Sequence, residues 1–345
     1  FDTTRSPFND LRAAQTETRD TDRAMRFDFE RRLTAAGGTL WLGTGALHRE
    51  KERRNETERL VYLRNPASLL PLSAVQTSYR AGLVVRDTYA LPPGLETDPI
   101  RALTAAGSPA FAFSPSRTVL ESLQDRYTSE EAVSGAYGLA LWTRGRWELD
   151  LGLRTERTRT RTLGTVIAPA DTDDGLGEEI TRVVDGGTEY VIRRAPGSNR
   201  YSTLLPSLAA AVRLGGGWTL RGTVFEQVMR PQYFDIVRYR RVHPPTTSIN
   251  EGNPNLRPTS IRNAAVAVDY RSAAVGEISF ELYRTKVTDF FYSAQRYEVI
   301  DGEQYSVARV ENGDEGTLQG FQVQWSRSFT LSGPVKKLVP AVAYT

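Results

Sequence analysis

The sequence predicts an all-β protein whose antiparallel strands follow one another up and down. Apolar and polar residues alternate over several segments, which is typical of strands with one face in a nonpolar environment. Short turns alternate along the chain with long polar excursions. No apolar run approaches the roughly 18 residues that a membrane-spanning helix requires. These observations predict a partial, up-and-down transmembrane β-barrel of about ten strands, with short periplasmic turns and long extracellular loops.

The composition is compatible with such a barrel and argues against several other classes. Hydrophobic residues make up 39% and charged residues 25% of the 345 residues, and only every second residue of a barrel strand faces lipid. A net charge of +3 is too small to indicate nucleic acid as a partner. The chain has no cysteine, and its two histidines, His48 and His243, lie far apart. Because no phosphate-binding loop or nucleophile elbow is present either, we expect no enzyme, no cofactor and no metal site.

The first hairpin is predicted from residues 21–33, where Phe27 and Phe29 alternate with charged residues. Residues 1–20 are polar and predict a loop. Ala35-Ala36-Gly37-Gly38 makes a tight turn, and the return strand, residues 39–58, becomes more charged after Leu47. Residues 59–125 predict a long outer loop with two turn signals. These signals are Pro92-Pro93-Gly94 and Ser114-Pro115-Ser116.

The second hairpin contains the clearest alternation in the chain. Its first strand begins at Tyr127, and Arg144-Gly145 is the predicted two-residue turn. On the return strand the apolar face carries Trp147, Leu149, Leu151 and Leu153, and the other face carries Glu148, Asp150, Gly152 and Arg154. Further along, the first face continues as Thr155, Arg157, Arg159 and Arg161. This change indicates that the strand leaves hydrocarbon for a layer of anionic headgroups.

The remaining elements repeat the same scheme. Strands are predicted at residues 201–214, 218–233, 260–271, 275–293 and 318–329, with a last strand from about Leu338. The predicted short turns are at residues 215–217 and 272–274 and at Gly333-Pro334, and the long loops at residues 164–199, 234–259 and 294–315. Aromatic residues near strand ends predict an interface girdle, namely Trp41, Trp142, Trp147, Trp218 and Tyr270. Charges on the other face predict a polar lumen, including Arg26, Glu30, Glu148, Asp150, Arg154 and Glu281.

Three motifs in the second half add a resemblance to these patterns. They are Leu205-Pro206-Ser207, Arg230-Pro231 and Gly252-Asn253-Pro254-Asn255-Leu256-Arg257-Pro258. In this order they resemble the C-terminal barrel half of TonB-dependent outer-membrane receptors. The resemblance covers residues 21–345, and the family's plug domain and final barrel strands have no counterpart, so we expect residues 1–345 to be one partial barrel domain of a longer receptor.

The resemblance implies a function in uptake. It implies location in the outer membrane of a Gram-negative bacterium, contact with lipid and lipopolysaccharide, and energy supplied by TonB through the plug. It also implies a scarce solute of the siderophore, cobalamin or oligosaccharide class. Two alternatives stay open: a soluble all-β module that binds carbohydrate, and a passive outer-membrane channel without a plug.

Candidate ligand contacts and structural motifs can be separated by their chemistry. In the Gly252–Pro258 motif, asparagine side chains can cap turns and the prolines fix φ, so we expect it to set the strand register rather than to contact ligand. Arg230-Pro231 marks the end of a strand. The basic run Arg238, Tyr239, Arg240 and Arg241 is the candidate ligand site, because guanidinium groups bind anions in a bidentate manner. Acidic residues also cluster at 171–179 (Asp171, Asp173, Asp174, Glu178 and Glu179), but their spacing is not that of an EF-hand calcium loop.

Overall fold

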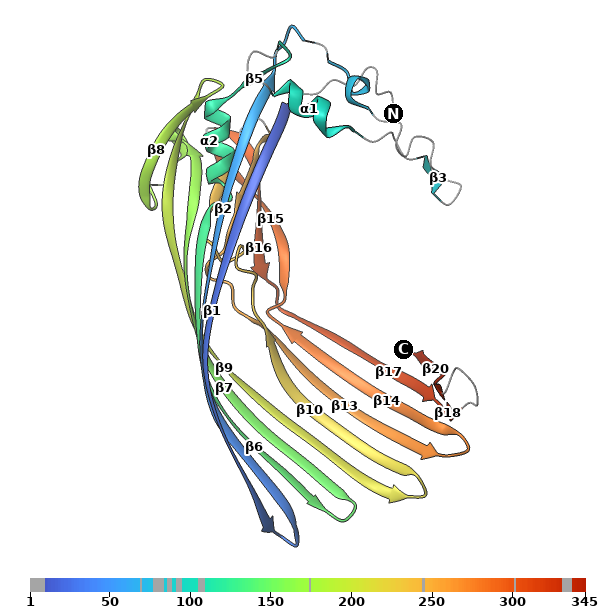
Figure 1. The fold of residues 1–345 in the computed structure, drawn as a ribbon. Coiled ribbons are helices and arrows are strands. Elements are labelled where there is room, and N and C mark those ends of the chain that lie inside the picture. The colour runs from blue at the N-terminus through green and yellow to red at the C-terminus, as the bar shows by residue number, and fades with distance from the viewer. Residues whose placement is uncertain are drawn as a thin grey trace.

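The computed structural model shows one strongly curved sheet with a layer of helices, shorter strands and loops at one end (Figure 1). It describes residues 10–68, 70–76, 84–85, 89–90, 95–104, 109–173, 175–243, 246–300, 302–330 and 337–345. Within these residues, no helix is long and apolar enough to cross a membrane. The predicted turns at residues 92–94 and 333–334 lie outside the described residues.

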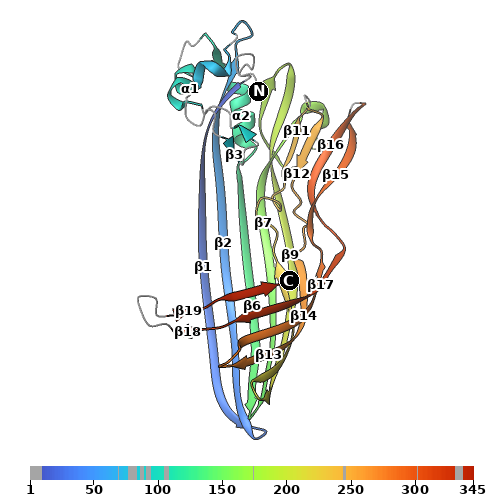
Figure 2. The ribbon, with the colours of Figure 1, turned by 90° about the vertical axis from the view of Figure 1, so that its right-hand side faces the viewer.

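Ten strands form the wall, each paired antiparallel with the next one in chain order. They are β1 (Asp10–Ala35), β2 (Gly38–Arg64), β6 (Tyr127–Arg144), β7 (Trp147–Pro169), β9 (Thr188–Gly215), β10 (Trp218–Met229), β13 (Thr259–Ser272), β14 (Gly276–Thr288), β17 (Glu315–Ser326) and β20 (Ala341–Tyr344). The two outermost strands, β1 and β20, each have a single partner among the described strands, so the sheet is an open part of a barrel (Figure 2). The predicted up-and-down architecture of about ten strands is confirmed.

Short turns gather at one end of the wall, as predicted. Ala36 and Gly37 both have positive φ, 50° and 70°, so the β1–β2 turn requires the left-handed region that glycine adopts without strain. In the second hairpin Arg144 still pairs with Trp147, so the turn is Gly145-Arg146 and not Arg144-Gly145. The predicted position was one residue early because Gly145, with φ 54°, is the first turn residue.

At the opposite end, the predicted loops contain much regular structure. β7 and β9 extend past residue 164 and before residue 199, and β8 (Glu178–Asp185) pairs with β9. The two later excursions hold β11 (Arg240–His243) and β12 (Ser248–Glu251), and the hairpin of β15 (Phe291–Ile300) and β16 (Glu303–Asn312). β11 runs parallel to β7, and β12 runs parallel to β16. Sequence periodicity missed these strands because a strand that is covered or polar on both faces has no apolar–polar alternation.

The predicted loops at residues 1–20 and 59–125 are also partly wrong. β1 begins at Asp10 and β2 runs to Arg64. The excursion then contains η1 (Leu72–Val75), β3 (Val84–Val85), β4 (Tyr89–Ala90), α1 (Thr97–Leu103), β5 (Phe111–Phe113) and α2 (Pro115–Leu123), and η2 (Ala170–Thr172) follows β7. The turn signal Ser114-Pro115-Ser116 is the start of α2, because Ser114 Oγ accepts from the Arg117 N–H at 3.4 Å and Pro115 opens the helix.

Helix α2 covers a part of β2 that β6 no longer reaches. The Val61 N–H donates to Thr118 Oγ1 at 3.0 Å, and the Arg59 N–H donates to Ser122 Oγ at 2.8 Å. Side chains of the helix therefore satisfy backbone donors that another strand would otherwise bind.

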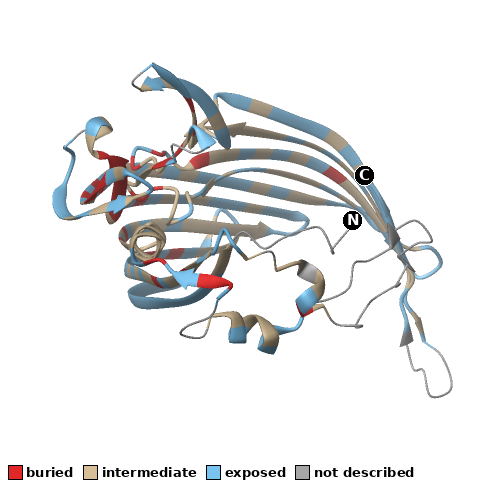
Figure 3. Ribbon diagram, turned by 90° about the horizontal axis from the view of Figure 1, so that it is seen from above, coloured by how far each residue is buried: buried red, intermediate tan, exposed pale blue. Residues whose placement is uncertain are grey.

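The two faces of the wall differ as a barrel requires. Leu151, Leu153 and Leu282 point outward and are about half exposed, and the six charges predicted for the lumen lie on the inner face by register. The buried core is small and lies at the loop end, where Ile167, Tyr190 and Ile192 pack beneath α2 (Figure 3). Among the described residues nothing covers these outward apolar side chains, as expected for a wall that faces lipid.

Aromatic residues at the turn end form the predicted girdle with one exception. On the outer face Trp218 and Tyr270 lie directly opposite each other, with rings 4.7 Å apart, and Trp147 lies in the neighbouring row. Trp41 shares its face with the buried Gly43 and Gly45, and so points inward. The prediction for Trp41 was wrong because proximity to a strand end does not determine which face a residue occupies.

Three short pairs complete the described structure. β5 pairs with the end of β2, β3 pairs with β4, and β18 (Phe329–Thr330) pairs with β19 (Lys337–Leu338). The connection from β17 to β20 passes through β18 and β19, so it is longer than the other connections at the turn end.

Candidate ligand-facing surface

The inner face of the wall carries a ladder of ion pairs above its middle. Asp20 accepts from Arg53 at 2.6 Å, and Asp22 accepts from Arg49 at 2.9 Å, which links β1 to β2. Closer to the turn end, Gly45 leaves room for Asp28 and Tyr137, since a Cβ there would lie 2.6 Å from the tyrosine ring. The ladder joins neighbouring strands on the side where a central plug or solute would lie.

The excursion between β10 and β13 folds back over this ladder. Arg230 pairs with the buried Glu156 of β7, which also accepts from Arg154 at 2.6 Å. The ring of Tyr233 lies 5.2 Å from both the Lys51 ammonium and the Arg53 guanidinium. Burial of this phenol raises the pKa of Tyr233 to about 12. The excursion is thus tied to β2 and β7 by charged contacts.

The predicted ligand run lies in this excursion, and two of its arginines have internal acidic partners. Arg240 pairs with Glu251 and, at 2.6 Å, with Glu298. Arg241 donates to Asp125 at 2.9 Å, and its guanidinium lies 4.7 Å from the Tyr239 ring. A contact with solute by these groups stays a prediction, and it requires exchange of partners.

The other two residues of the run are held by packing. Tyr239 stacks on Phe234 with ring centroids 4.6 Å apart. The Arg238 carbonyl lies against Gly164 of β7, where a Cβ would approach to 2.2 Å. The backbone of the run is therefore pressed directly onto the wall.

The Gly252–Pro258 motif joins several parts of the outer end. Asn253 Oδ1 accepts from the Asn255 N–H at 3.1 Å, and its Nδ2 donates to the Val310 carbonyl of β16 at 3.1 Å. Asn199 of β9 donates to the carbonyl of Leu256, whose side chain is 1% exposed. A Cβ on Gly252 would lie 1.8 Å from the Val237 carbonyl. The motif makes contacts to β9, to β16 and to its own excursion, as expected of a structural element.

Further motif residues also have packing partners or mark strand ends. Ser207 lies opposite Gly152, and its Oγ would be 2.4 Å from a Cβ there. β9 pairs with β10 only from Ser207 onward. Pro206, after Leu205, lies just before that point, so its missing N–H removes no hydrogen bond to β10. Pro254 fills space above Gly197 of β9, and Pro258 directly precedes β13. β10 ends at Met229, immediately before Arg230-Pro231.

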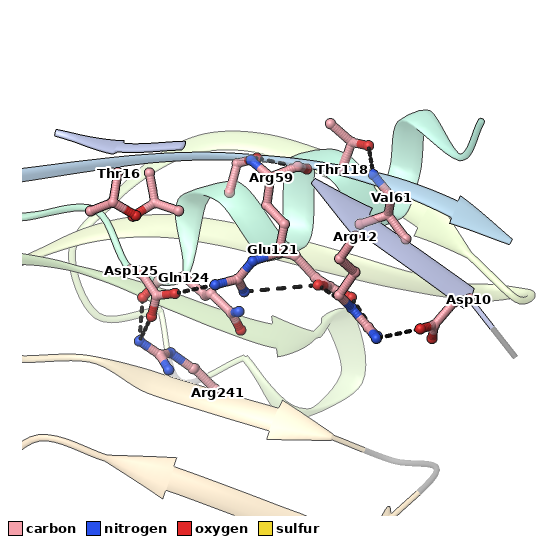
Figure 4. A network of polar contacts seen from close by, with 12 residues as sticks. Asp10, Arg12, Thr16, Arg59, Val61, Thr118, Glu121, Gln124, Asp125 and Arg241 are labelled. Carbon is pink, nitrogen blue, oxygen red and sulfur yellow. Dashed lines mark hydrogen bonds and ion pairs between the residues drawn. The ribbon is translucent and has the colours of Figure 1, made fainter. Parts of the chain in front are cut away.

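We call the end of the wall that carries the long excursions the outer mouth. A network of ion pairs crosses it from β1 to β11 (Figure 4). Arg12 binds Glu121 of α2 through two hydrogen bonds of 2.8 and 3.1 Å. Arg59 links Glu121 and Asp125, and Asp125 in turn accepts from Arg241. Arg12, Arg59 and Glu121 were not predicted as site residues, because they lie in segments predicted as irregular. In the sequence, the Ser114-Pro115 cap could have indicated the start of α2, which carries Glu121 of this network.

Beside the network lies a cavity of about 330 Å³. Its charged and titratable lining consists of Arg12, Arg117, Arg241, His243, Glu121, Asp185 and Tyr190. Arg117 pairs with Asp185 at 2.5 Å, and burial lowers the pKa of His243, with the nearby arginine charges acting in the same direction. Each of the three guanidinium groups already has a carboxylate partner, namely Glu121 for Arg12, Asp185 for Arg117 and Asp125 for Arg241, so an anionic ligand would bind by exchange of one of these pairs.

The acidic segment after β7 is engaged with arginines. Asp173 accepts from Arg193 at 2.8 Å, and this hydrogen bond holds the pKa of Asp173 below its usual range. Glu179 accepts from Arg182 at 2.9 Å, whereas Asp174 lies outside the described residues. In the described part of the chain, no three acidic, histidine or cysteine side chains are grouped to hold a metal ion.

Several solved structures are similar to this chain. The ferric-catecholate import receptor Fiu of E. coli K12 is 9% identical with a TM-score of 0.51, over 95% of this chain and 38% of that protein. The hemophore receptor HasR of Serratia marcescens, solved as a double mutant with HasA and heme, is 14% identical with a TM-score of 0.47, over 90% and 46%. The alcaligin outer-membrane receptor FauA of Bordetella pertussis is 10% identical with a TM-score of 0.45, over 96% and 40%. The chain spans less than half the length of each.

Sequence comparison identifies the family. A comparison with curated proteins gave no match. The family described as TonB dependent receptor-like, beta-barrel matches residues 1–345. This family consists of receptors and transporters and not of enzymes. The chain belongs to the TonB-dependent receptor β-barrel family.

Proposed function

We propose that this chain forms wall strands and outer loops of an outer-membrane receptor that captures a scarce solute and imports it with energy from TonB. The observation that carries the proposal is the division of the wall into an uncovered apolar outer face and an ion-paired inner face. Family membership supplies the link to receptors and transporters. In this arrangement the short turns face the periplasm and the folded excursions face outside.

The inner ladder is suited to hold a plug domain. Its charges at Asp20, Arg49 and Arg53 lie on the lumen side and bind in pairs, and partly exposed pairs exchange partners at small cost. A plug with complementary charges would dock there and receive the pull of TonB. The proposed domain organisation is therefore a barrel segment, residues 1–345, acting together with a plug.

The outer-mouth cavity is the proposed first contact for solute. Its three guanidinium groups could exchange their carboxylate partners for anionic oxygens of a siderophore, which a neutral oligosaccharide does not offer. The similar receptor Fiu imports a ferric catecholate, which agrees with an iron chelate as the solute class. Cobalamin and oligosaccharides are the competing classes in the test.

The test uses a strain that lacks the gene for the full-length protein. We expect the wild-type protein in the outer-membrane fraction, β-rich after detergent extraction, and we expect its loss to abolish growth on one ferric chelate as sole iron source. Deletion of tonB should abolish the same uptake. Recovery of the protein in soluble form without detergent would overturn the proposal, and uptake that continues without TonB would indicate a passive channel.

A further inference from the structure

The strands at the outer mouth form a continuous sheet with an open edge at each end. Their order is β15, β16, β12, β11, β7 and β9, and β8 pairs with β9 on its far side. Among the described strands, β15 and β8 therefore each have one paired and one open edge. An open edge offers unpaired backbone donors and acceptors to another chain, so natural proteins usually protect it with charges or a bulge.

The edge at β8 carries both of these protections. Its pairing with β9 shifts register between Glu179 and Thr181, which marks a β-bulge. Arg182, which donates to Glu179 at 2.9 Å, places a charge on the exposed face of the strand. The bulge and the charge both disfavour the addition of a further strand at β8.

The edge at β15 has neither protection. The strand pairs with β16 over its whole length without a register shift. Its two charged side chains are bound by neighbouring strands of the same sheet, since Arg296 donates to Glu251 of β12 at 3.0 Å and Glu298 accepts from Arg240 of β11 at 2.6 Å. Ile300, on the same face, packs against a buried apolar cluster. One face of β15 is thus fixed to the sheet, while the edge of the strand stays open.

The open edge of β15 presents backbone groups next to apolar side chains. The Ser306 N–H of β16 donates to the Thr247 carbonyl at 2.9 Å, on the side of β16 that faces away from β15. Its register partner Tyr297 therefore belongs to a pair without hydrogen bonds, and the backbone groups of Tyr297 point to the open edge. By alternation, those of Gln295 and Val299 point the same way. The residues Tyr297 and Val299 are also 72% and 68% exposed.

We propose that β15 binds an extended segment of a secreted partner protein, which adds to this sheet as a further strand (Figure 2). Hydrogen bonds to the backbones of Gln295, Tyr297 and Val299 supply affinity, and apolar residues at alternate positions of the segment pack on Tyr297 and Val299. Glu303, at the tip of the β15–β16 hairpin, is exposed and has no ion pair in the described chain, so it is complementary to a basic residue at one end of the segment.

A second copy of this chain does not fit the open edge. Antiparallel pairing of two β15 strands would invert one wall relative to the other, whereas two copies in one membrane have the same orientation. A partner from the external medium has no such restriction, because the edge lies at the outer mouth. The inference goes beyond the proposed uptake and rests on it only for the outward orientation of the excursions.

The test measures binding of a synthetic peptide to the purified full-length protein in lipid nanodiscs. The probe is a fluorescent peptide of alternating valine and threonine with one terminal arginine, and its anisotropy gives the dissociation constant. N-methylation of the amides on one edge of the peptide should weaken binding about tenfold, because these amides donate to β15, whereas methylation on the other edge should have little effect.

Two matched protein variants assign the binding to one edge. Tyr297→Ser combined with Val299→Ser should weaken binding about tenfold, because it removes the apolar contact of the added strand. The control, Ile180→Ser combined with Val184→Ser, makes a similar change on the exposed face of β8 and should leave binding unchanged.

Hydrogen exchange separates a partner from other segments of the receptor itself. In the full-length protein the amides of Gln295 and Tyr297 should exchange rapidly without peptide and become protected when it binds. Protection that is already present without peptide would show that the receptor covers its own edge, and would overturn the inference. No binding at millimolar peptide, or equal binding of both methylated peptides, would also overturn it. None of these results bears on the outer-membrane location or on uptake, so the inference and the proposed function fail separately.

Discussion

Beyond Thr155, the two faces of β7 have different surroundings. Inward, Glu156, Thr158 and Thr160 are buried beneath the excursion that follows β10. Outward, Arg157 and Arg159 alternate with them and are exposed. The inner charge is neutralised by protein, whereas the outer charges have no protein partner in the described chain. The inner face is thus completed by this chain's own loops, whereas the outer face is left for the membrane of the proposed location.

The largest effect is expected from loss of the Leu256 side chain, which is buried in the excursion that covers the inner face. Leu256→Ala should lower the free energy of unfolding by about 2–5 kcal/mol, because the side chain is fully buried and its loss leaves a cavity. Chemical denaturation of the protein in lipid bilayers measures it. Leu256→Met conserves volume and should cost less than about 1.5 kcal/mol. Equal values for the two variants would show that the motif is not packed as described.

The next largest effect is expected for a charge placed among the outward apolar side chains of β7. Leu151→Arg should destabilise the protein in bilayers by about 2–4 kcal/mol, because it places a charge in hydrocarbon. The same unfolding experiment applies. Asp150→Arg on the opposite face is the matched control, and we expect a change below about 1 kcal/mol because that face is polar. A similar cost at both positions would argue that the two faces are not lipid and lumen.

A smaller effect compares carboxylates on the two faces. Glu156→Gln should cost about 1–3 kcal/mol, because the buried carboxylate accepts from two arginines that would lose their counter-charge. Glu52→Gln on the outer face should change stability by less than about 0.5 kcal/mol, since Glu52 has no ion pair in the described chain. Thermal unfolding of both variants in the same detergent measures the difference. An equal cost would contradict the distinction between paired and unpaired faces.

Strand number, order and the apolar face followed from the sequence because lipid imposes a strict alternation on each wall strand. Leu149, Leu151 and Leu153 show this pattern in β7. Beyond Thr155 the same strand continues to Pro169, yet its outward residues are charged and its last residues are covered on both sides. Alternation is lost in the covered last residues of β7, because alternation reports the contrast between two environments and not the strand itself.

The candidate site was less predictable because its residues come together through tertiary contacts. Arg241 was recognisable as a basic loop residue, but its partner Asp125 lies far away in the chain. Glu121 became a partner of Arg12 only through the placement of α2 against β2. Gly252 and Asn253 were recognisable because backbone conformation constrains residue type locally. Local constraints can be inferred from sequence, whereas long-range charge pairing requires the fold.

The smallest predicted effect concerns His243 at the outer mouth. Burial lowers the pKa of His243, so the folded chain binds its proton less readily than the unfolded chain. The stabilisation is complete above the unfolded pKa of about 6.5 and is lost as pH falls below it. The residue is exposed to solvent, so screening limits the change to a few tenths of a kcal/mol. The surrounding charged and titratable groups are Arg12, Arg117, Glu121, Asp185, Tyr190 and Arg241.

Hydrogen exchange of the β11 amides between pH 8 and pH 5 measures this effect, after correction for the intrinsic pH dependence of exchange. The wild type should lose protection in β11 as pH falls, whereas His243→Gln should keep it constant. Both proteins should show the same protection in β13, far from the histidine, which serves as the internal control. Loss of protection in the variant as large as in the wild type would assign the acid sensitivity to the carboxylates Glu121 and Asp185, whose protonation would break their pairs with Arg12 and Arg117.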